Sequence, residues 1–179
     1  EDADERSVNY PQHNNTTTQQ HVLKCCTVAV LQHKMSPRTW TFITLGGIFL
    51  LAMDQALKFF AFSHQTFTRY IMEPWLGWEY FANPGIAFSL PIPNAFLITA
   101  TPFILLAILL LIPKQKHLLP ALSLILITAG AISNFIDSIL YGVTIDYLRI
   151  AESVFNLGDV AIVVGAILFA SKQRKAAIR

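Results

Sequence analysis

Residues 118–136 read LLPALSLILITAGAISNFI, and these nineteen residues without a charge decide the fold. A helix that crosses a membrane needs about 20 consecutive, mostly apolar residues. On either side of this stretch, three others meet or nearly meet the requirement: residues 40–62, 95–112 and 156–170. The sequence therefore predicts a mainly α-helical, polytopic membrane protein with four transmembrane helices.

The composition agrees with a membrane protein. Hydrophobic residues make up 54% of the 179 residues, charged residues only 13%, and the mean hydropathy is +0.49. Soluble domains carry about 25% charged residues, so the low charged fraction argues against a soluble domain. It also argues against a nucleic-acid-binding protein, and the net charge of +2 does not indicate a particular binding partner. The two cysteines, Cys25 and Cys26, are adjacent, which argues against a disulfide scaffold or a CxxC metal site.

Residues 1–34 differ in composition from the rest of the chain. Residues 1–20 are rich in Asp, Glu, Asn, Gln and Thr, which is typical of disorder. We expect residues 1–34 to be an unstructured tail or a non-native extension, and residues 35–179 to form the four-helix membrane domain. A secretory signal over residues 22–31 is the alternative, but Lys24 interrupts its apolar run.

Basic residues predict the orientation, because connections rich in Lys and Arg stay in the cytoplasm. They cluster before the first stretch, between the second and third, and after the fourth, at Lys34, Arg38, Lys114, Lys116, Lys172, Arg174, Lys175 and Arg179. The other two connections carry only Arg69 and Arg149. Both termini are therefore expected in the cytoplasm, with residues 63–94 and 137–155 on the outer side.

The longer outer connection is not a plain linker. Residues 71–90 mix Trp, Tyr and Phe with Gly and Pro. Such a mixture is typical of short strands at a membrane interface, where Trp and Tyr concentrate. We expect a small extracytoplasmic β-element here, between the first and second helices.

Ionisable residues inside apolar stretches are costly and point to a specific role. Asp54 and Lys58 lie four residues apart, hence on one face of the predicted first helix, where they can pair. We interpret them as a structural ion pair that ties this helix to its neighbours. Catalysis by Asp54 is the alternative, and it is disfavoured because Lys58 would hold this carboxylate ionised.

Asp146 and Asp159 are placed differently, near the outer ends of the third and fourth stretches. Two carboxylates in a poorly hydrated pocket cannot both ionise easily, so they share a proton. One can then act as a base toward water and the other as an acid toward the substrate, which is aspartic-protease chemistry. A helix-capping role for Asp159 is the alternative.

Three asparagines are predicted on the same side as these aspartates: Asn83, Asn134 and Asn156. A side-chain amide in such a place needs a hydrogen-bond partner, from the backbone, a side chain or a substrate. Other chemistries fit less well. His64 and His117 are predicted on opposite sides of the membrane, so neither a Ser-His-Asp arrangement nor a histidine metal site is expected.

Five motifs occur in an order that resembles one known family: Asp54-Gln-Ala-Leu-Lys58, Asn83-Pro-Gly-Ile-Ala-Phe-Ser89, Gly130-Ala-Ile-Ser-Asn-Phe-Ile-Asp137, Val143-Thr-Ile-Asp146-Tyr and Phe155-Asn-Leu-Gly-Asp159. Together they resemble bacterial lipoprotein signal peptidase, also called signal peptidase II. The resemblance covers residues 35–179.

The resemblance implies an aspartyl endopeptidase, without a cofactor or metal, in the bacterial cytoplasmic membrane. Its substrates would be diacylglyceryl-modified prolipoproteins, cut just before the lipidated cysteine, and the expected enzyme is a monomer in contact with membrane lipid. Asp146 and Asp159 match the family's catalytic positions. Positions that shape the site or bind substrate are matched by Asn83, Gly85, Asn134 and Asn156, and Asp54 and Lys58 match a polar pair that supports the fold.

The sequence departs from the family pattern at three positions. Ser138 follows Asp137 where the family usually has an arginine expected to contact the substrate, and Pro84 and Gly158 are milder changes. Because both aspartates are present, we interpret the chain as a divergent but active enzyme. Two alternatives remain: an inactive homologue that binds lipoproteins, and a small transporter or channel with an ion path through Asp54, Lys58 and Asp159.

Overall fold

The computed structural model describes residues 35–84 and 94–177. The elements follow in the order α2 (Pro37–Ser63), β1 (Arg69–Met72), β2 (Leu76–Asn83), α3 (Asn94–Leu111), the short 3-10 helix η2 (Ile112–Lys114), α4 (Leu118–Tyr141), β3 (Thr144–Ile150), β4 (Ser153–Phe155) and α5 (Leu157–Ala177). The protein is thus mainly helical with one small antiparallel sheet, as the sequence predicted.

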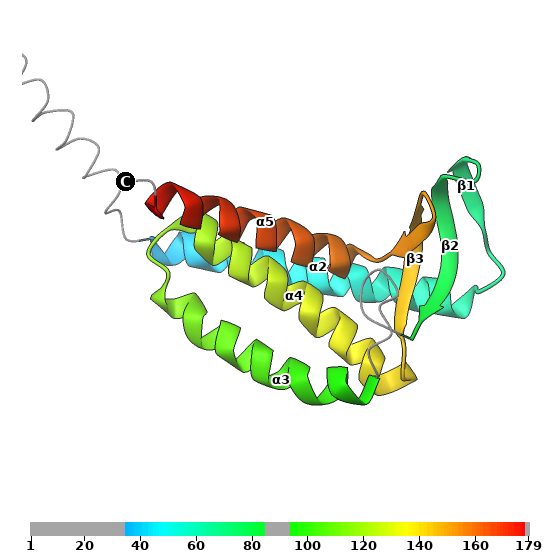
Figure 1. The fold of residues 1–179 in the computed structure, drawn as a ribbon, viewed down its shortest axis with the longest axis horizontal. Helices are drawn as coiled ribbons and strands as arrows, with labels where there is room; N and C mark the ends of the chain where they lie inside the picture. Colours follow the sequence, from blue (N-terminus) through cyan, green and yellow to red (C-terminus); the bar gives the residue numbers. More distant parts are fainter. Residues whose placement is uncertain (1–34, 85–93, 178–179) are drawn as a thin grey trace, which may run out of the picture. The chain divides into compact units, whose positions relative to one another are not determined.

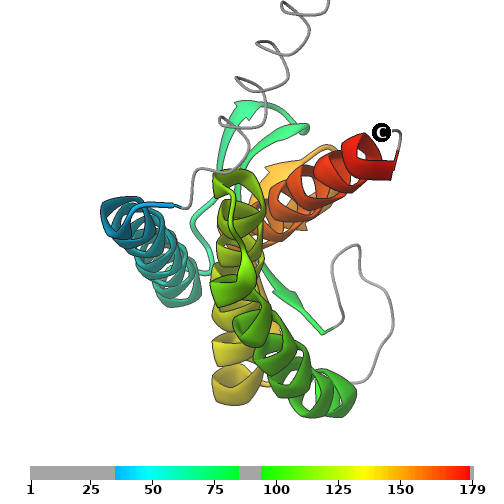
Figure 2. The same cartoon turned by 90° about the vertical axis from the view of Figure 1, so that its left-hand side faces the viewer.

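Helix α4 is the centre of the helical part. It packs against α2, α3 and α5, while α2 and α5 touch each other only slightly. Figure 2, which looks along the helices, shows α2 and α5 on either side of α4. The sheet lies at one end of these helices (Figure 1). Residues of α2, α4 and α5 therefore meet at the end of the helices where the sheet lies.

Local sequence explains where the helices begin and end. The Ser36 hydroxyl accepts the Thr39 amide N–H (3.2 Å) at the start of α2, and Pro37 stands at the first helical position, where a missing N–H costs nothing. Gly142 ends α4 in the left-handed conformation (φ 73°), which glycine adopts without strain. Helix α4 is therefore five residues longer than residues 118–136, and it includes Asp137 and Ser138.

Small residues let α4 and α5 approach closely. A Cβ on Gly130 would collide with the carbonyl oxygen of Gly158 and would lie 2.9 Å from the Ile162 side chain. A Cβ on Gly165 would lie 2.7 Å from the carbonyl oxygen of Ser123. Gly130 thereby brings α4 close to the start of α5, and Gly165 allows a second close contact nearer the beginning of α4.

The sheet has the order β1-β2-β3-β4, with every neighbouring pair antiparallel. The β-element predicted between the first two long helices is present as β1 and β2, and the sheet extends beyond it. Its other half, β3 and β4, comes from the connection between α4 and α5, and Arg149 lies in β3. The strand β2 pairs with β3 so that Phe81 faces Asp146 and Asn83 faces Thr144.

Many polar side chains are buried and many large apolar side chains are exposed, the reverse of the arrangement in a water-soluble protein. Among the described residues, the buried polar and charged side chains outnumber the buried apolar ones, and large apolar side chains such as Phe42, Phe49 and Phe103 are 69–75% exposed. Of the 27 residues of α2, the buried ones are Gly47, Asp54, Lys58 and Ala61. Such an apolar exterior is unfavourable in water, whereas it is favourable in the hydrocarbon interior of a lipid bilayer.

Two of the described helices, Pro37–Ser63 and Leu118–Tyr141, are long and apolar enough to cross a membrane. The segments Ile98–Lys114 and Leu157–Ser171 are shorter apolar helices. All four stretches found in the sequence are therefore helical, while their placement as four spans stays a prediction. The predicted tail, residues 1–34, and the candidate residue Gly85 lie outside the described residues.

Candidate active site

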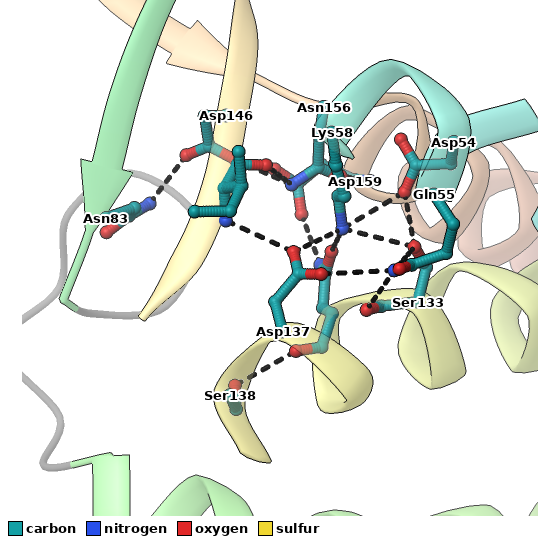
Figure 3. Close-up of polar contacts among 12 residues, drawn as sticks. Asp54, Gln55, Lys58, Asn83, Ser133, Asp137, Ser138, Asp146, Asn156 and Asp159 are labelled. Carbon is teal, nitrogen blue, oxygen red and sulfur yellow. Dashed lines mark hydrogen bonds and ion pairs between the residues drawn. The ribbon is translucent and has the colours of Figure 1, made fainter. Parts of the chain in front are cut away.

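Asp146 lies in β3, the central strand nearest the helices, and its side chain is fully buried. Both carboxylate oxygens accept amide hydrogens: Nδ2 of Asn83 donates to Oδ2 (2.9 Å) and Nδ2 of Asn156 donates to Oδ1 (2.6 Å). Asn83 comes from the end of β2 and Asn156 from the residue before α5. The register between β2 and β3 thus places Asn83 beside Asp146 (Figure 3).

Asp159 lies in the first turn of α5 and is 7% exposed. Its Oδ1 accepts the Nδ2 hydrogen of Asn134, on α4, at 2.8 Å. Its backbone N–H donates to Oδ1 of Asn156 (2.8 Å), which makes Asn156 the cap of the helix. The predicted capping role in this region therefore belongs to Asn156.

Asn156 joins the two aspartates directly. Its Oδ1 accepts the backbone N–H of Asp159, so its Nδ2 must point the other way, toward Asp146. The structure thus brings Asp146 and Asp159 together with the three asparagines Asn83, Asn134 and Asn156. Figure 3 shows the side chains of Asp146, Asn156 and Asp159 drawn together.

The electrostatics of Asp146 fit a shared proton. Burial, and next the negative charge of Asp159, raise the pKa of Asp146 to about 7, while the amides of Asn83 and Asn156 oppose this shift. A carboxyl group that remains protonated near neutral pH beside a second carboxylate can act as an acid while its neighbour acts as a base.

A second polar cluster lies beside the aspartates, around Lys58. The ammonium is 2% exposed and contacts Oδ2 of Asp54 at 3.0 Å and Oδ2 of Asp137 at 2.9 Å. The predicted ion pair between Asp54 and Lys58 is therefore confirmed, but it has a third member from α4. Gln55 and Ser133 complete the cluster: Nε2 of Gln55 donates to Oγ of Ser133 and to Oδ1 of Asp137.

Each carboxylate of this cluster also holds a backbone segment next to one aspartate of the site. Oδ1 of Asp54 accepts the N–H of Leu157 (3.0 Å), two residues before Asp159. Oδ2 of Asp137 accepts the N–H of Ile145 (3.1 Å), the residue before Asp146. The cluster thereby ties β3 and the start of α5 to α2 and α4.

Tyr147 connects the cluster to the sheet. Burial, and next the Asp54 carboxylate, raise the pKa of Tyr147 above its ordinary range, so its hydroxyl remains protonated. It donates to Oδ1 of Asp54 (2.8 Å), and its ring stacks on Trp78 of β2 at a centroid distance of 4.8 Å.

Sequence reasoning gave no role to Gln55, Ser133, Asp137 or Tyr147. A partial signal was present: Ser133 and Asp137 lie four residues apart, hence on one face of α4. The spacing does not show which helix this face contacts, so the contact of Asp137 with Lys58 could not be predicted from it. Ser138 is also buried, and its hydroxyl donates to the Asn134 carbonyl oxygen (2.9 Å). Within residues 35–84 and 94–177, no group of three or more His, Cys, Asp or Glu side chains is arranged to hold a metal ion.

Two buried carboxylates lie at the end of an apolar helix bundle, beneath a small sheet, and this arrangement suits the chemistry of an aspartic peptidase in a membrane. The profile of the family described as signal peptidase (SPase) II matches residues 47–173. The chain is 31% identical over 153 residues to the lipoprotein signal peptidase of Serratia marcescens, covering 79% of this chain and 88% of that protein. It is also 31% identical over 150 residues to the lipoprotein signal peptidase of Bartonella quintana (strain Toulouse), covering 78% and 90%. The chain belongs to the signal peptidase II family.

A solved structure described as a bacterial membrane enzyme, determined by the in meso method, shares the fold. Its TM-score is 0.72 at 24% identity, and the match covers 82% of this chain and 93% of that one. Family membership and the apolar exterior together indicate an integral membrane protein.

Proposed function

We propose that this peptidase removes signal peptides from prolipoproteins with Asp146 and Asp159 as its catalytic dyad. The observation that carries the proposal is the pairing of the two carboxylates. Both are buried, the charge of Asp159 raises the pKa of Asp146, and Asn156 bonds to both residues. The names of the relatives supply the substrate class, since both are lipoprotein signal peptidases.

The reaction needs one proton on the pair. The ionised carboxylate takes a proton from water, and the resulting hydroxide attacks the carbonyl carbon of the scissile peptide. The protonated carboxyl group donates its proton to the carbonyl oxygen, which gives a tetrahedral intermediate. As the intermediate collapses, the carboxyl group that took the proton from water gives it to the leaving nitrogen, and the re-formed carbonyl returns its proton to the other carboxylate. Asn83, Asn134 and Asn156 hold the two carboxylates in place, because each donates to an aspartate oxygen.

The substrate would carry a diacylglyceryl group on the cysteine that follows the cut. The apolar exterior supports this reading, because acyl chains in the bilayer can lie against the exposed side chains of α3 and α4, among them Phe103, Leu106 and Ile139. The peptide would then reach the dyad at the end of the bundle where the sheet lies. Three residues near the dyad depart from the family pattern, Ser138, Pro84 and Gly158, and the hydrogen bonds of both aspartates are present beside them.

The proposed topology has four spans, both termini in the cytoplasm, and the dyad at the outer face of the bacterial cytoplasmic membrane. The basic clusters support this orientation. In addition, the acidic residues of the helices, Asp54, Asp137 and Asp159, meet at the sheet end. An ion path would need such groups along the length of the helices, so the transporter alternative gains no support.

Exchanging either aspartate tests the proposal. Asp146→Asn and Asp159→Asn keep the shape of the side chain but remove the carboxyl chemistry, so each should lower kcat by roughly 10²-fold or more. The double variant should be no worse than either single one, because the pair acts as a unit. The measurement is cleavage of a purified diacylglyceryl-modified prolipoprotein in detergent, with the exposed Glu73→Gln as a control that retains full turnover.

A single variant with near-normal turnover would contradict the proposed dyad. If the protein without any substitution binds the prolipoprotein but does not cleave it, the alternative of an inactive homologue is favoured.

A further inference from the structure

Lys58 is a buried cation that does not touch Asp146 or Asp159. Its ammonium has four partners: Oδ2 of Asp54 (3.0 Å), Oδ2 of Asp137 (2.9 Å), Oγ of Ser133 (3.1 Å) and Oδ1 of Asn134 (2.7 Å). The shortest of these contacts goes to a neutral amide rather than to a carboxylate. A cation needed only to neutralise Asp54 and Asp137 would not require that contact.

The contact determines which way the Asn134 amide faces. An ammonium group can only donate, so it must meet the oxygen end of the amide. The nitrogen end is thereby turned toward Oδ1 of Asp159, to which it donates at 2.8 Å. With the amide rotated by half a turn, two donors would face each other at Lys58, and an oxygen would face the carboxylate of Asp159.

We propose that Lys58 is a positioning residue for Asp159 and acts through Asn134. Its ammonium holds the Asn134 amide in the orientation that keeps an N–H donor on Oδ1 of Asp159. This inference rests on the proposed function, because it assigns Lys58 a part in the work of the dyad. It differs from the structural ion pair, whose members would need only the contacts to Asp54 and Asp137.

The test compares two variants that differ in one property. Lys58→Gln keeps an N–H donor at the end of the side chain, whereas Lys58→Met has a similar length and volume and no donor. Each is combined with Asp137→Asn, so that the cluster keeps the net charge of minus one that Asp54, Asp137 and Lys58 have together. The matched pair shares the loss of the cation and of one carboxylate, and therefore shares any structural cost.

The expected result is a difference in kcat between the two. Lys58→Met should lower kcat by roughly 10- to 100-fold, as expected for losing a hydrogen bond to a charged group. Lys58→Gln should recover at least about 5-fold of this loss, but not all of it, because its amide is one bond shorter. The KM and the unfolding temperatures of the two variants should agree. Equal kcat values would overturn the proposal, because a purely structural role predicts them.

A second measurement leaves Lys58 and its ion pairs in place and decides the matter even if the Lys58 variants do not fold. Asn134→Asp retains an acceptor for the ammonium but removes the donor to Asp159. Its kcat should fall by about 10-fold or more, measured at a temperature at which the variant is folded by circular dichroism. Full turnover in this variant would overturn the proposal.

Asp159→Asn, measured beside it, separates this inference from the proposed function. If Asp159→Asn is inactive and Asn134→Asp is fully active, the dyad stands and the role of Lys58 fails. If Asp159→Asn is active, both fail together.

Discussion

The two pairs of buried carboxylates in this protein have different partners. Asp54 and Asp137 both contact the ammonium of Lys58. Asp146 and Asp159 accept hydrogen bonds from neutral side-chain amides instead. A cation in direct contact offsets negative charge, whereas amides donate hydrogen bonds to a carboxylate without adding charge. The first pair is therefore suited to hold structure together, and the second to exchange a proton.

This difference predicts how stability depends on pH. The pKa of Asp146 is raised to about 7 in the folded protein, against about 3.9 in an unfolded chain. Between these values the folded state binds more protons, so the stability contributed by this group falls as the pH rises from about 4 through about 7. Asp146→Asn removes the penalty of the buried charge. At pH 8 it should unfold a few degrees above the parent, since about 1 kcal/mol corresponds to roughly 2–4 °C in a chain of this size.

Thermal unfolding in detergent at pH 8 and near pH 4 checks this prediction. The difference between Asp146→Asn and the parent should vanish at the lower pH. The exposed Glu73→Gln serves as the control, with no change at either pH. A lower unfolding temperature for Asp146→Asn than for the parent at pH 8 would contradict the prediction that the buried charge of Asp146 destabilises the folded protein.

At the residue scale, spacing rules found part of the site. The interval of four residues between Asp54 and Lys58 predicted their contact, which the structure confirms. No such rule gave the third member, Asp137, because it depends on how α2 and α4 face each other. The amide bonds of Asn156 likewise depend on the approach of β3 to α5, which no local pattern contains.

At the scale of elements, helices were easier to predict than strands. Apolar length identified all four long helices, and the ends of α2 and α3 fall within three residues of the predicted ones. The strand β3 was missed because its partner β2 lies some sixty residues earlier in the chain. Its sequence, Thr-Ile-Asp-Tyr-Leu-Arg-Ile, is buried at its first four positions and does not alternate as a half-exposed strand would. Pairing of this kind comes from the fold and not from local periodicity.

The contact between α4 and α5 gives a prediction at the same scale. Gly130→Ala places a methyl group against the backbone of Gly158, which cannot move aside without shifting α5. We expect a loss of stability of about 1–3 kcal/mol, as for overpacking of a tight contact, together with reduced turnover because Asp159 follows Gly158. The matched control is Gly46→Ala, since nothing lies within 4 Å of a Cβ there.

Thermal unfolding and cleavage assays on both glycine variants make the comparison. The Gly46 variant should be as stable as the parent or slightly more so, because alanine favours a helix. Equal behaviour of the two variants would show that α4 and α5 are not in tight contact.

At the scale of the whole molecule, hydropathy predicted the long apolar helices and the apolar exterior. Apolar residues face outward and polar ones gather inside near the sheet. This arrangement follows from composition alone once lipid is taken as the solvent, because the bilayer leaves polar groups only each other as partners. The share of the sheet contributed by the connection between α4 and α5 could not be derived in this way.

The proposed topology is tested by labelling in intact cells. Cys25 and Cys26 are first replaced by serine, and a single cysteine is introduced by Thr68→Cys in the connection before β1 or by Gln115→Cys between η2 and α4. An impermeant thiol reagent should label the first variant and not the second, because the basic residues Lys114 and Lys116 hold the latter connection in the cytoplasm. Both should react after the cells are permeabilised. The reverse pattern of labelling would invert the topology.

The bond between Asp54 and the Leu157 amide has a consequence for how the enzyme is made. A ribosome delivers α2 first and α5 last, and Asp159 arrives with α5. Until α5 has been made, Asp54 has no helix start to hold and Asp146 has no second carboxylate beside it. If Asp146 and Asp159 form the catalytic dyad, as proposed, a chain that lacks α5 is expected to be inactive. Activity then appears only once α5 has packed against α4.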